Sequence, residues 1–125
     1  MVMLDHTILR VSNIAASIRF YRDVLGFEYI GRAGPFEMIR INTELTLDLM
    51  EVSPKDPMHF AFSFDRATFD ALHARLLQYG IAFGSDVFER DGRIAQNSFG
   101  AKGNAQAFYF YDPDRHNLEA RLYTQ

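Results

Sequence analysis

The sequence contains the same plan of secondary structure twice. Each half begins with a strand-like segment that carries a histidine, His6 in the first half and His59 in the second. An amphipathic segment with helical spacing follows in each half and ends at a glycine, Gly26 or Gly80. The two histidines are 53 positions apart and the two glycines are 54 apart, so the halves keep nearly the same register. This agreement restricts the chain to folds built from two copies of one unit.

Each half is predicted to have β-α-β-β-β order, with Asn13 and Asp65 as the N-caps of the two helices. The expected strands cover residues 4–11, 27–32, 36–42 and 45–52 in the first half, and residues 58–64, 81–83, around 87–90, 107–111 and 117–123 in the second. The polar, glycine-containing stretch 91–105 is expected to be a loop. We therefore predict one α+β domain, 1–125, made of modules at about 4–52 and 58–123.

Composition excludes several classes of protein. The chain has 125 residues, 48% of them hydrophobic, which is typical of a folded domain and not of a disordered one. A net charge of −3 gives no overall basic field, so we expect no nucleic acid partner. We find neither an apolar run of the roughly 18–20 residues that a membrane span needs nor a signal-like segment at 1–5, and so expect a cytoplasmic protein without a membrane partner. Cysteine is absent, so any metal ligand must be His, Asp or Glu.

Strand alternation brings several polar side chains to one face of the second half. The turn at 112–116 predicts a hairpin centred on position 114, which places Tyr109 opposite Glu119. Cross-strand partners lie on the same face, and Arg121 joins them because it is two residues after Glu119. In the first strand of the chain, Arg10 shares a face with His6 by the same alternation.

These faces predict a metal site. If a pseudo-twofold axis relates the halves, their equivalent strands meet around one cavity, to which His6, His59 and Glu119 all contribute. Asp48 is the first-half counterpart of Glu119, and it would be either a fourth ligand or a hydrogen-bond partner of a ligand histidine. Two imidazoles and a carboxylate suit Fe²⁺, Zn²⁺, Ni²⁺, Co²⁺ or Mn²⁺ and leave coordination positions open for substrate.

Other charged residues have two interpretations each. Arg10 and Arg121 would either bind an anionic group of a substrate at the cavity mouth or extend along the surface with the guanidinium in water. His73, within the second predicted helix, is expected at the surface, and His116, in a predicted turn, is expected to be solvated.

Four segments carry a resemblance to a known family: D-H-T-I-L-R-V at 5–11, S-I-R-F-Y-R-D-V-L-G-F at 17–27, H-F-A-F at 59–62 and F-Y-F-Y-D-P-D-R-H-N-L-E at 108–119. The family that they resemble is the vicinal oxygen chelate superfamily, which includes glyoxalase I, extradiol dioxygenases, fosfomycin-resistance proteins and bleomycin-binding proteins. The resemblance implies a mixed, cupped, half-barrel sheet and a divalent metal that chelates two neighbouring oxygens of a small-molecule substrate. The family's ligand positions fall on His6, His59 and Glu119, with Asp48 at an optional fourth position. Many two-module members are homodimers, some with the site built across the subunit interface.

The resemblance leaves several chemistries open. An extradiol dioxygenase would use Fe²⁺, and Tyr109, ten residues before Glu119, would hydrogen-bond the substrate. A glyoxalase I-like lyase would isomerise a hemithioacetal with a carboxylate moving the proton, but that family usually has Glu where Asp48 stands.

A fosfomycin-type thiol transferase fits less well, because Ile8 and Ala107 replace expected hydroxyl residues. Bleomycin-type binding proteins lack the metal ligands altogether. We favour the extradiol type, with Tyr109 and Glu119 as catalytic residues.

Overall fold

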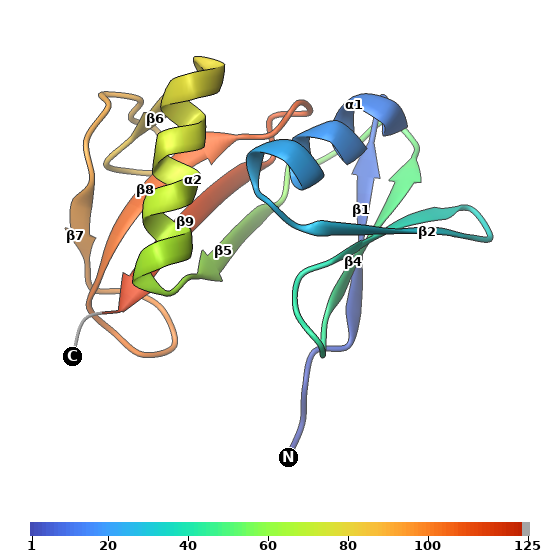
Figure 1. The fold of residues 1–125 in the computed structure, drawn as a ribbon, viewed down its shortest axis with the longest axis horizontal. Coiled ribbons are helices and arrows are strands. Elements are labelled where there is room, and N and C mark those ends of the chain that lie inside the picture. The colour runs from blue at the N-terminus through green and yellow to red at the C-terminus, as the bar shows by residue number, and fades with distance from the viewer. Residues whose placement is uncertain (124–125) are drawn as a thin grey trace. The chain divides into compact units, whose positions relative to one another are not determined.

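The computed structural model describes residues 1–123 and has two compact units, residues 1–57 and a second unit that begins at Met58 (Figure 1). The first unit contains β1 (His6–Val11), α1 (Ile14–Arg19), the π-helical turn η1 (Phe20–Val24), β2 (Glu28–Ala33), β3 (Phe36–Arg40) and β4 (Thr46–Glu51). Its open sheet has the order β1-β4-β3-β2, in which β1 is parallel to β4 and the other pairs are antiparallel.

The second unit repeats this order with one added strand. It contains β5 (His59–Ser63), α2 (Arg66–Tyr79), β6 (Phe83–Gly84), β7 (Ala95–Asn97), β8 (Ala105–Tyr111) and β9 (Asn117–Tyr123). Its sheet has the order β5-β9-β8-β6, and β7 also pairs with β8. The α2 helix lies across one face of this sheet (Figure 1). Phe69 of α2 packs on Phe108 of β8 with their ring centroids 4.9 Å apart, which helps to close the core.

Local signals in the sequence set the helix ends as predicted. The Asn13 side chain accepts a hydrogen bond from the Ala16 backbone N–H at 3.0 Å, and the Asp65 side chain does the same for Thr68 at 2.8 Å. Gly80 ends α2 with a left-handed φ of 67°, a conformation that glycine adopts without strain. The predicted α+β class is confirmed, and so is the β-α-β-β-β repeat, which β7 interrupts in the second unit.

The repeat extends to the register of the sheets. In the first unit β1 and β4 pair His6 with Thr46 and Ile8 with Asp48. In the second unit β5 and β9 pair His59 with Asn117 and Ala61 with Glu119. Asp48 and Glu119 therefore occupy equivalent positions relative to the histidine of their own unit.

Two predictions about the 85–105 segment are wrong. The expected strand around 87–90 is a turn, in which only an isolated bridge joins Asp86 to Glu89. The expected loop 91–105 contains β7, whose polar residues pair with β8. The strand β7 was missed because short strands at a sheet edge need few apolar residues, so alternation detects them poorly.

The two histidines outside the predicted site were also misplaced. His116 is fully buried, and its Nδ1 accepts a hydrogen bond from the Met58 backbone N–H at 2.8 Å. His73 is half-buried, with its ring edge-on to Phe83 and Phe108 at centroid distances of 5.1 and 5.9 Å. Both side chains thus support the packing of the second unit.

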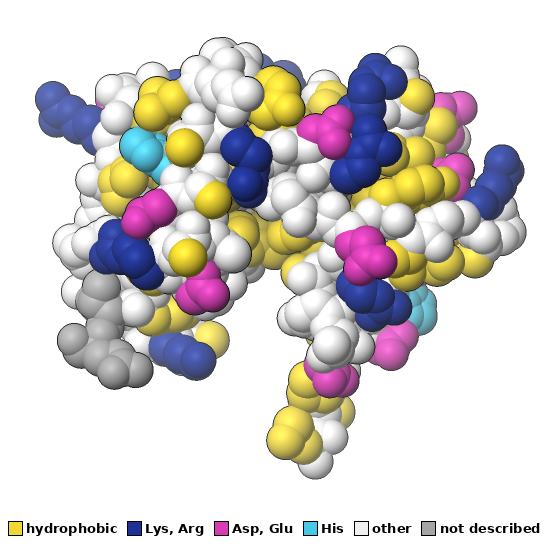
Figure 2. Space-filling model, in the orientation of Figure 1, with side chains coloured by type: hydrophobic (Ala, Val, Ile, Leu, Met, Phe, Trp, Pro, Cys, Tyr) yellow, Lys and Arg dark blue, Asp and Glu magenta, His cyan; other side chains and the backbone are white. Residues whose placement is uncertain are grey.

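On the face of the molecule shown in Figure 2, Lys and Arg side chains lie between Asp and Glu side chains and form no continuous basic patch. Within residues 1–123, no helix has the length and apolar character that crossing a membrane requires.

Candidate functional site

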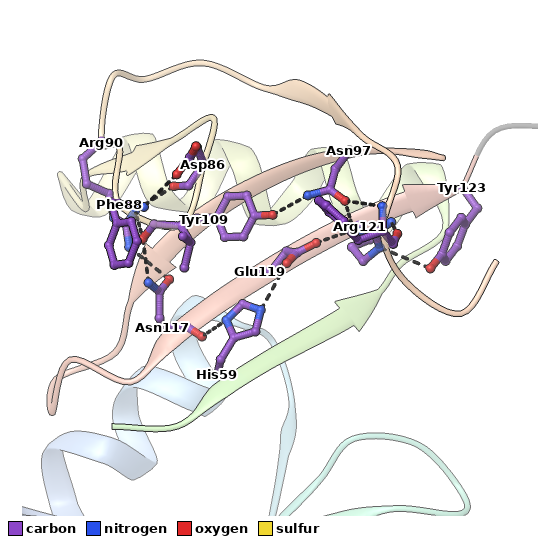
Figure 3. A network of polar contacts seen from close by, with 12 residues as sticks. His59, Asp86, Phe88, Arg90, Asn97, Tyr109, Asn117, Glu119, Arg121 and Tyr123 are labelled. Carbon is purple, nitrogen blue, oxygen red and sulfur yellow. Dashed lines mark hydrogen bonds and ion pairs between the residues drawn. The ribbon is translucent and has the colours of Figure 1, made fainter. Parts of the chain in front are cut away.

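His59 is held in one tautomer by its own sheet. It is the first residue of β5, and its Nδ1 lies 2.8 Å from the backbone carbonyl oxygen of Asn117 on β9 (Figure 3). A carbonyl oxygen can only accept, so Nδ1 carries the hydrogen and donates it. In the neutral ring Nε2 is therefore the nitrogen with the free lone pair, which is the form that binds metals.

That lone pair faces a carboxylate. The Nε2 atom of His59 is 3.2 Å from Oε1 of Glu119, whose side chain is only 6% exposed. Two acceptors at this distance need a positive charge between them, either a second proton on the ring or a metal ion. Metal–nitrogen and metal–oxygen bonds of about 2.0–2.2 Å place neighbouring donor atoms roughly 3 Å apart. The pair therefore fits two adjacent ligands of one divalent ion.

Tyr109 lies opposite Glu119 in the β8–β9 ladder, as the hairpin arithmetic predicted. Its ring stacks on the His59 ring at a centroid distance of 6.2 Å, and its hydroxyl accepts a hydrogen bond from Asn97 Nδ2 at 2.6 Å. Burial, followed by the charge and hydrogen bond of Glu119, raises the pKa of Tyr109 to about 12. The hydroxyl thus stays protonated at neutral pH and remains a hydrogen-bond donor.

Arg121 does not extend along the surface into water, so one of the two interpretations of the sequence is wrong. Its side chain is 5% exposed, and its guanidinium donates to Oε2 of Glu119. The atoms that accept hydrogen bonds from its guanidinium belong to the protein and not to an anionic ligand. Figure 3 shows it between Glu119 and Tyr123, on the same strand as both.

A cleft of about 390 Å³ opens beside Tyr109. Its lining comes from the 85–99 segment as well as from β8: Ser85, Asp86, Val87, Gln96, Asn97, Ser98, Phe99 and Tyr109. The sequence did not identify Asn97, which bonds to both Tyr109 and Arg121. Asn97 lies in a polar stretch that contains several Asn and Gln residues, and the sequence pattern does not single out any one of them. No signal in the sequence could therefore have identified Asn97 as a site residue.

The first unit arranges its equivalent residues differently. His6 is exposed, and its Nδ1 lies 2.7 Å from Oδ2 of the adjacent Asp5, the hydrogen bond that chiefly raises the pKa of His6. Asp48 is buried, and its Oδ1 accepts a hydrogen bond from the Thr46 hydroxyl at 2.9 Å. Arg10 lies with His6 on the exposed face of β1.

The second unit alone supplies two candidate ligands. Among its described residues, 58–123, no third His, Asp or Glu joins His59 and Glu119 to form a metal-binding group. The further ligand that the sequence predicts is His6 of the first unit.

Comparison with protein families gives one match over most of the chain. The model of the family described as the Glyoxalase/Bleomycin resistance protein/Dioxygenase superfamily matches residues 3–120.

Individual relatives point in more than one direction. The chain is 32% identical to the virulence protein STM3117 of Salmonella typhimurium, over 96% of this chain and 83% of that protein. It is 25% identical to the metallothiol transferase FosB of Lysinibacillus sphaericus, over 93% of this chain and 79% of that protein. Among solved structures, the oxidase ChaP-H2 matches with a TM-score of 0.86 and 32% identity, over 98% of this chain and 94% of that chain.

Proposed function

Since the chain belongs to the Glyoxalase/Bleomycin resistance protein/Dioxygenase superfamily, we propose that it is a divalent-metal-dependent enzyme of the extradiol-dioxygenase type. Its substrate would be a small molecule with two neighbouring oxygens. The observation that carries the proposal is the His59–Glu119 pair, in which the free lone pair of an imidazole faces a carboxylate oxygen at 3.2 Å. In support, the chain is 32% identical to the oxidase ChaP-H2, whose structure is solved.

We assign His59, Glu119 and His6 as the metal ligands, with Fe²⁺ as the favoured ion and Ni²⁺, Zn²⁺, Co²⁺ or Mn²⁺ as alternatives. A bound divalent ion would supply Lewis-acid binding of the two substrate oxygens. Asp48 would be the optional fourth ligand, although its Oδ1 already accepts a hydrogen bond from the Thr46 hydroxyl. The expected assembly is a homodimer.

The protein's own residues would bind and orient the substrate. Tyr109 lines the cleft and keeps its proton at neutral pH, and that proton would turn from Glu119 to a substrate oxygen when the carboxylate binds the metal. Asn97 fixes the direction of that hydroxyl through its bond at 2.6 Å. The cleft wall formed by 85–99 would exclude water from the bound substrate.

Metal content tests the proposal. Untagged wild-type protein should contain nearly stoichiometric iron by elemental mass spectrometry, and His59→Ala should lose it while its far-UV circular dichroism is unchanged. His73→Ala is the matched control, because that histidine contacts Phe83 and Phe108 and not the site. Iron retained in His59→Ala would remove His59 from the ligand set. Zinc or nickel lost on mutation would favour the lyase or the thiol transferase, and the relative named metallothiol transferase FosB supports the latter.

The source of His6 can be measured by mixing inactive variants. His6→Ala and His59→Ala each lose one ligand. If a site takes His6 from one copy and His59 from another, a mixed dimer keeps one complete site and regains metal. If both ligands come from one chain, the mixture regains none.

Tyr109→Phe separates binding from chemistry. It removes only the hydroxyl, so the metal should stay bound. Turnover of a catechol under O₂ should fall about 100-fold, as when one positioned donor is lost from an active site. Unchanged turnover would mean that the Tyr109 hydroxyl has no role in the reaction and that the side chain only packs.

A further inference from the structure

Arg121 uses every donor of its guanidinium within the second unit. Nε donates to the Tyr123 hydroxyl at 3.2 Å, and Nη1 donates to Asn97 Oδ1 at 3.0 Å and to Glu119 Oε2. Nη2 donates to the backbone carbonyls of Phe99 and of Gly103, the latter at 2.9 Å. A guanidinium has five N–H groups, so none is left for a ligand. Arg121 is thus built into the site as a connector.

One of these bonds divides the two oxygens of Glu119. Oε2 accepts from Arg121, whereas Oε1 faces His59 Nε2 at 3.2 Å. The pairing is buried on both sides, with side-chain exposures of 5% and 6%. A carboxylate fixed in this way presents one oxygen toward the histidine and keeps the other occupied.

The other bonds fix the loop 97–103, which curls around the guanidinium. Gly100 has a φ of 102°, and a Cβ placed there would lie 2.8 Å from the Tyr123 hydroxyl and 2.9 Å from Nη2 of Arg121. The backbone therefore approaches the guanidinium as closely as only glycine allows. The same loop carries Phe99, whose exposed ring borders the cleft.

We propose that Arg121 is a positioning residue that leaves Glu119 a single ligating oxygen, Oε1, and ties that carboxylate to the loop 97–103 beside the cleft. The inference rests on the proposed function, because it takes Glu119 as a ligand. With three one-atom protein ligands, a six-coordinate ion keeps three open positions. A bidentate Glu119 would leave two, one too few for two substrate oxygens and O₂ together.

Cobalt titration of the full-length apo protein tests the first part. Co²⁺ absorption reports coordination number directly, without any assay of activity. Arg121→Met frees Oε2, so the Co²⁺ spectrum should change, and the dissociation constant should rise about 10–100-fold, as for other losses of a group that orients a ligand. Arg121→Lys keeps the charge and one donor to Glu119, and so should restore the wild-type spectrum and an affinity within about threefold.

Hydrogen exchange of the metal-free protein tests the second part. A lysine ammonium is too compact to reach both loop carbonyls and Glu119. Arg121→Lys should therefore speed the exchange of 97–104 as much as Arg121→Met does. Arg40→Met is the matched control, because Arg40 also donates to a backbone carbonyl, that of Asn42, and belongs to the first unit. It should leave the Co²⁺ spectrum unchanged.

Failure of the inference and failure of the proposed function give different results. If wild type takes up no Co²⁺, or His59→Ala binds it equally well, the metal site itself is wrong. If that comparison behaves as expected but Arg121→Met keeps the wild-type spectrum and affinity, the metal site stands and the role of Arg121 is overturned. Should Arg121→Met fail to fold, Arg121→Leu replaces it with the same expected result, because a leucine side chain likewise offers Glu119 no donor.

Discussion

The two units have the same sheet register but differ at three positions that share a face with their histidines. The ladders make the following positions equivalent, first unit before second: His6 and His59, Asp48 and Glu119, Met38 and Tyr109, Met50 and Arg121. Only the histidine is kept. The backbone register therefore places a histidine and an acid together in both units, and the remaining two positions decide whether they interact.

In the second unit the acid is long enough to reach the histidine and has a cation behind it. Glu119 lies 3.2 Å from His59 and accepts from Arg121. In the first unit the acid is one methylene shorter, Met50 offers no charge, and Asp48 accepts from Thr46 instead. The comparison shows that two units with the same backbone register can differ in their polar contacts. The histidine and the acid interact in the second unit, whereas the acid bonds to a threonine in the first.

Removing the acid from each unit should give the largest difference between them. Glu119→Ala leaves the buried guanidinium of Arg121 without its counter-charge, so it should lower the free energy of unfolding by about 3–5 kcal/mol. Asp48→Ala loses the hydrogen bond from Thr46, which is worth about 1 kcal/mol. Urea denaturation of the metal-free proteins measures both. Equal losses would mean that the two acids have the same structural role.

Glycine substitutions give a smaller effect that isolates the loop around Arg121. Gly31 in the first unit and Gly100 in the second have nearly the same φ, 104° and 102°, but a Cβ at Gly31 would meet nothing within 4 Å. Gly31→Ala should cost about 1–2 kcal/mol for backbone strain alone. Gly100→Ala should cost about 1–3 kcal/mol more, because it also crowds Arg121 and Tyr123. Thermal denaturation compares them, and identical losses would argue against close packing of the loop.

The smallest predicted effect concerns His6, whose hydrogen-bond partner is the adjacent Asp5. The pKa of His6 is raised above 6.5, chiefly by the hydrogen bond to Asp5. Asp5→Asn should return it toward that value, as read from the midpoint of the ring-proton shifts in an NMR titration. The folded protein holds this proton more tightly than the unfolded chain, so the bond stabilises at low pH and its contribution is lost as pH rises through the raised pKa. An unchanged midpoint would assign the shift to other charges.

The sequence was sufficient for the parts of the site that lie on regular strands. The symmetric turn at 114 was enough to pair Tyr109 with Glu119, since the residues of a hairpin pair according to its turn. The matched spacing of His6 and His59 likewise anticipated that Asp48 and Glu119 are equivalent. Period-two alternation sufficed for both.

The sequence was not sufficient for what the loops contribute. The carbonyls of Phe99 and Gly103 that accept from Arg121 belong to the backbone, so no residue type in the sequence predicts these bonds. The sequence placed His116 in solvent because polar turns are usually exposed. In the structure its ring accepts a hydrogen bond from the Met58 backbone N–H. Long-range bonds of loops depend on the tertiary fold, which local patterns do not encode.

The stacking of Tyr109 on His59 also affects the tyrosine fluorescence of the protein. The chain has six tyrosines and no tryptophan, so tyrosine fluorescence is not masked by a stronger emitter. Tyr109 holds its hydroxyl against Glu119 and its ring 6.2 Å from the His59 ring. An excited tyrosine becomes a stronger acid, and a carboxylate beside it takes its proton and quenches its emission. Occupation of His59 and Glu119 by a cation would change that quenching, so the site carries its own optical label.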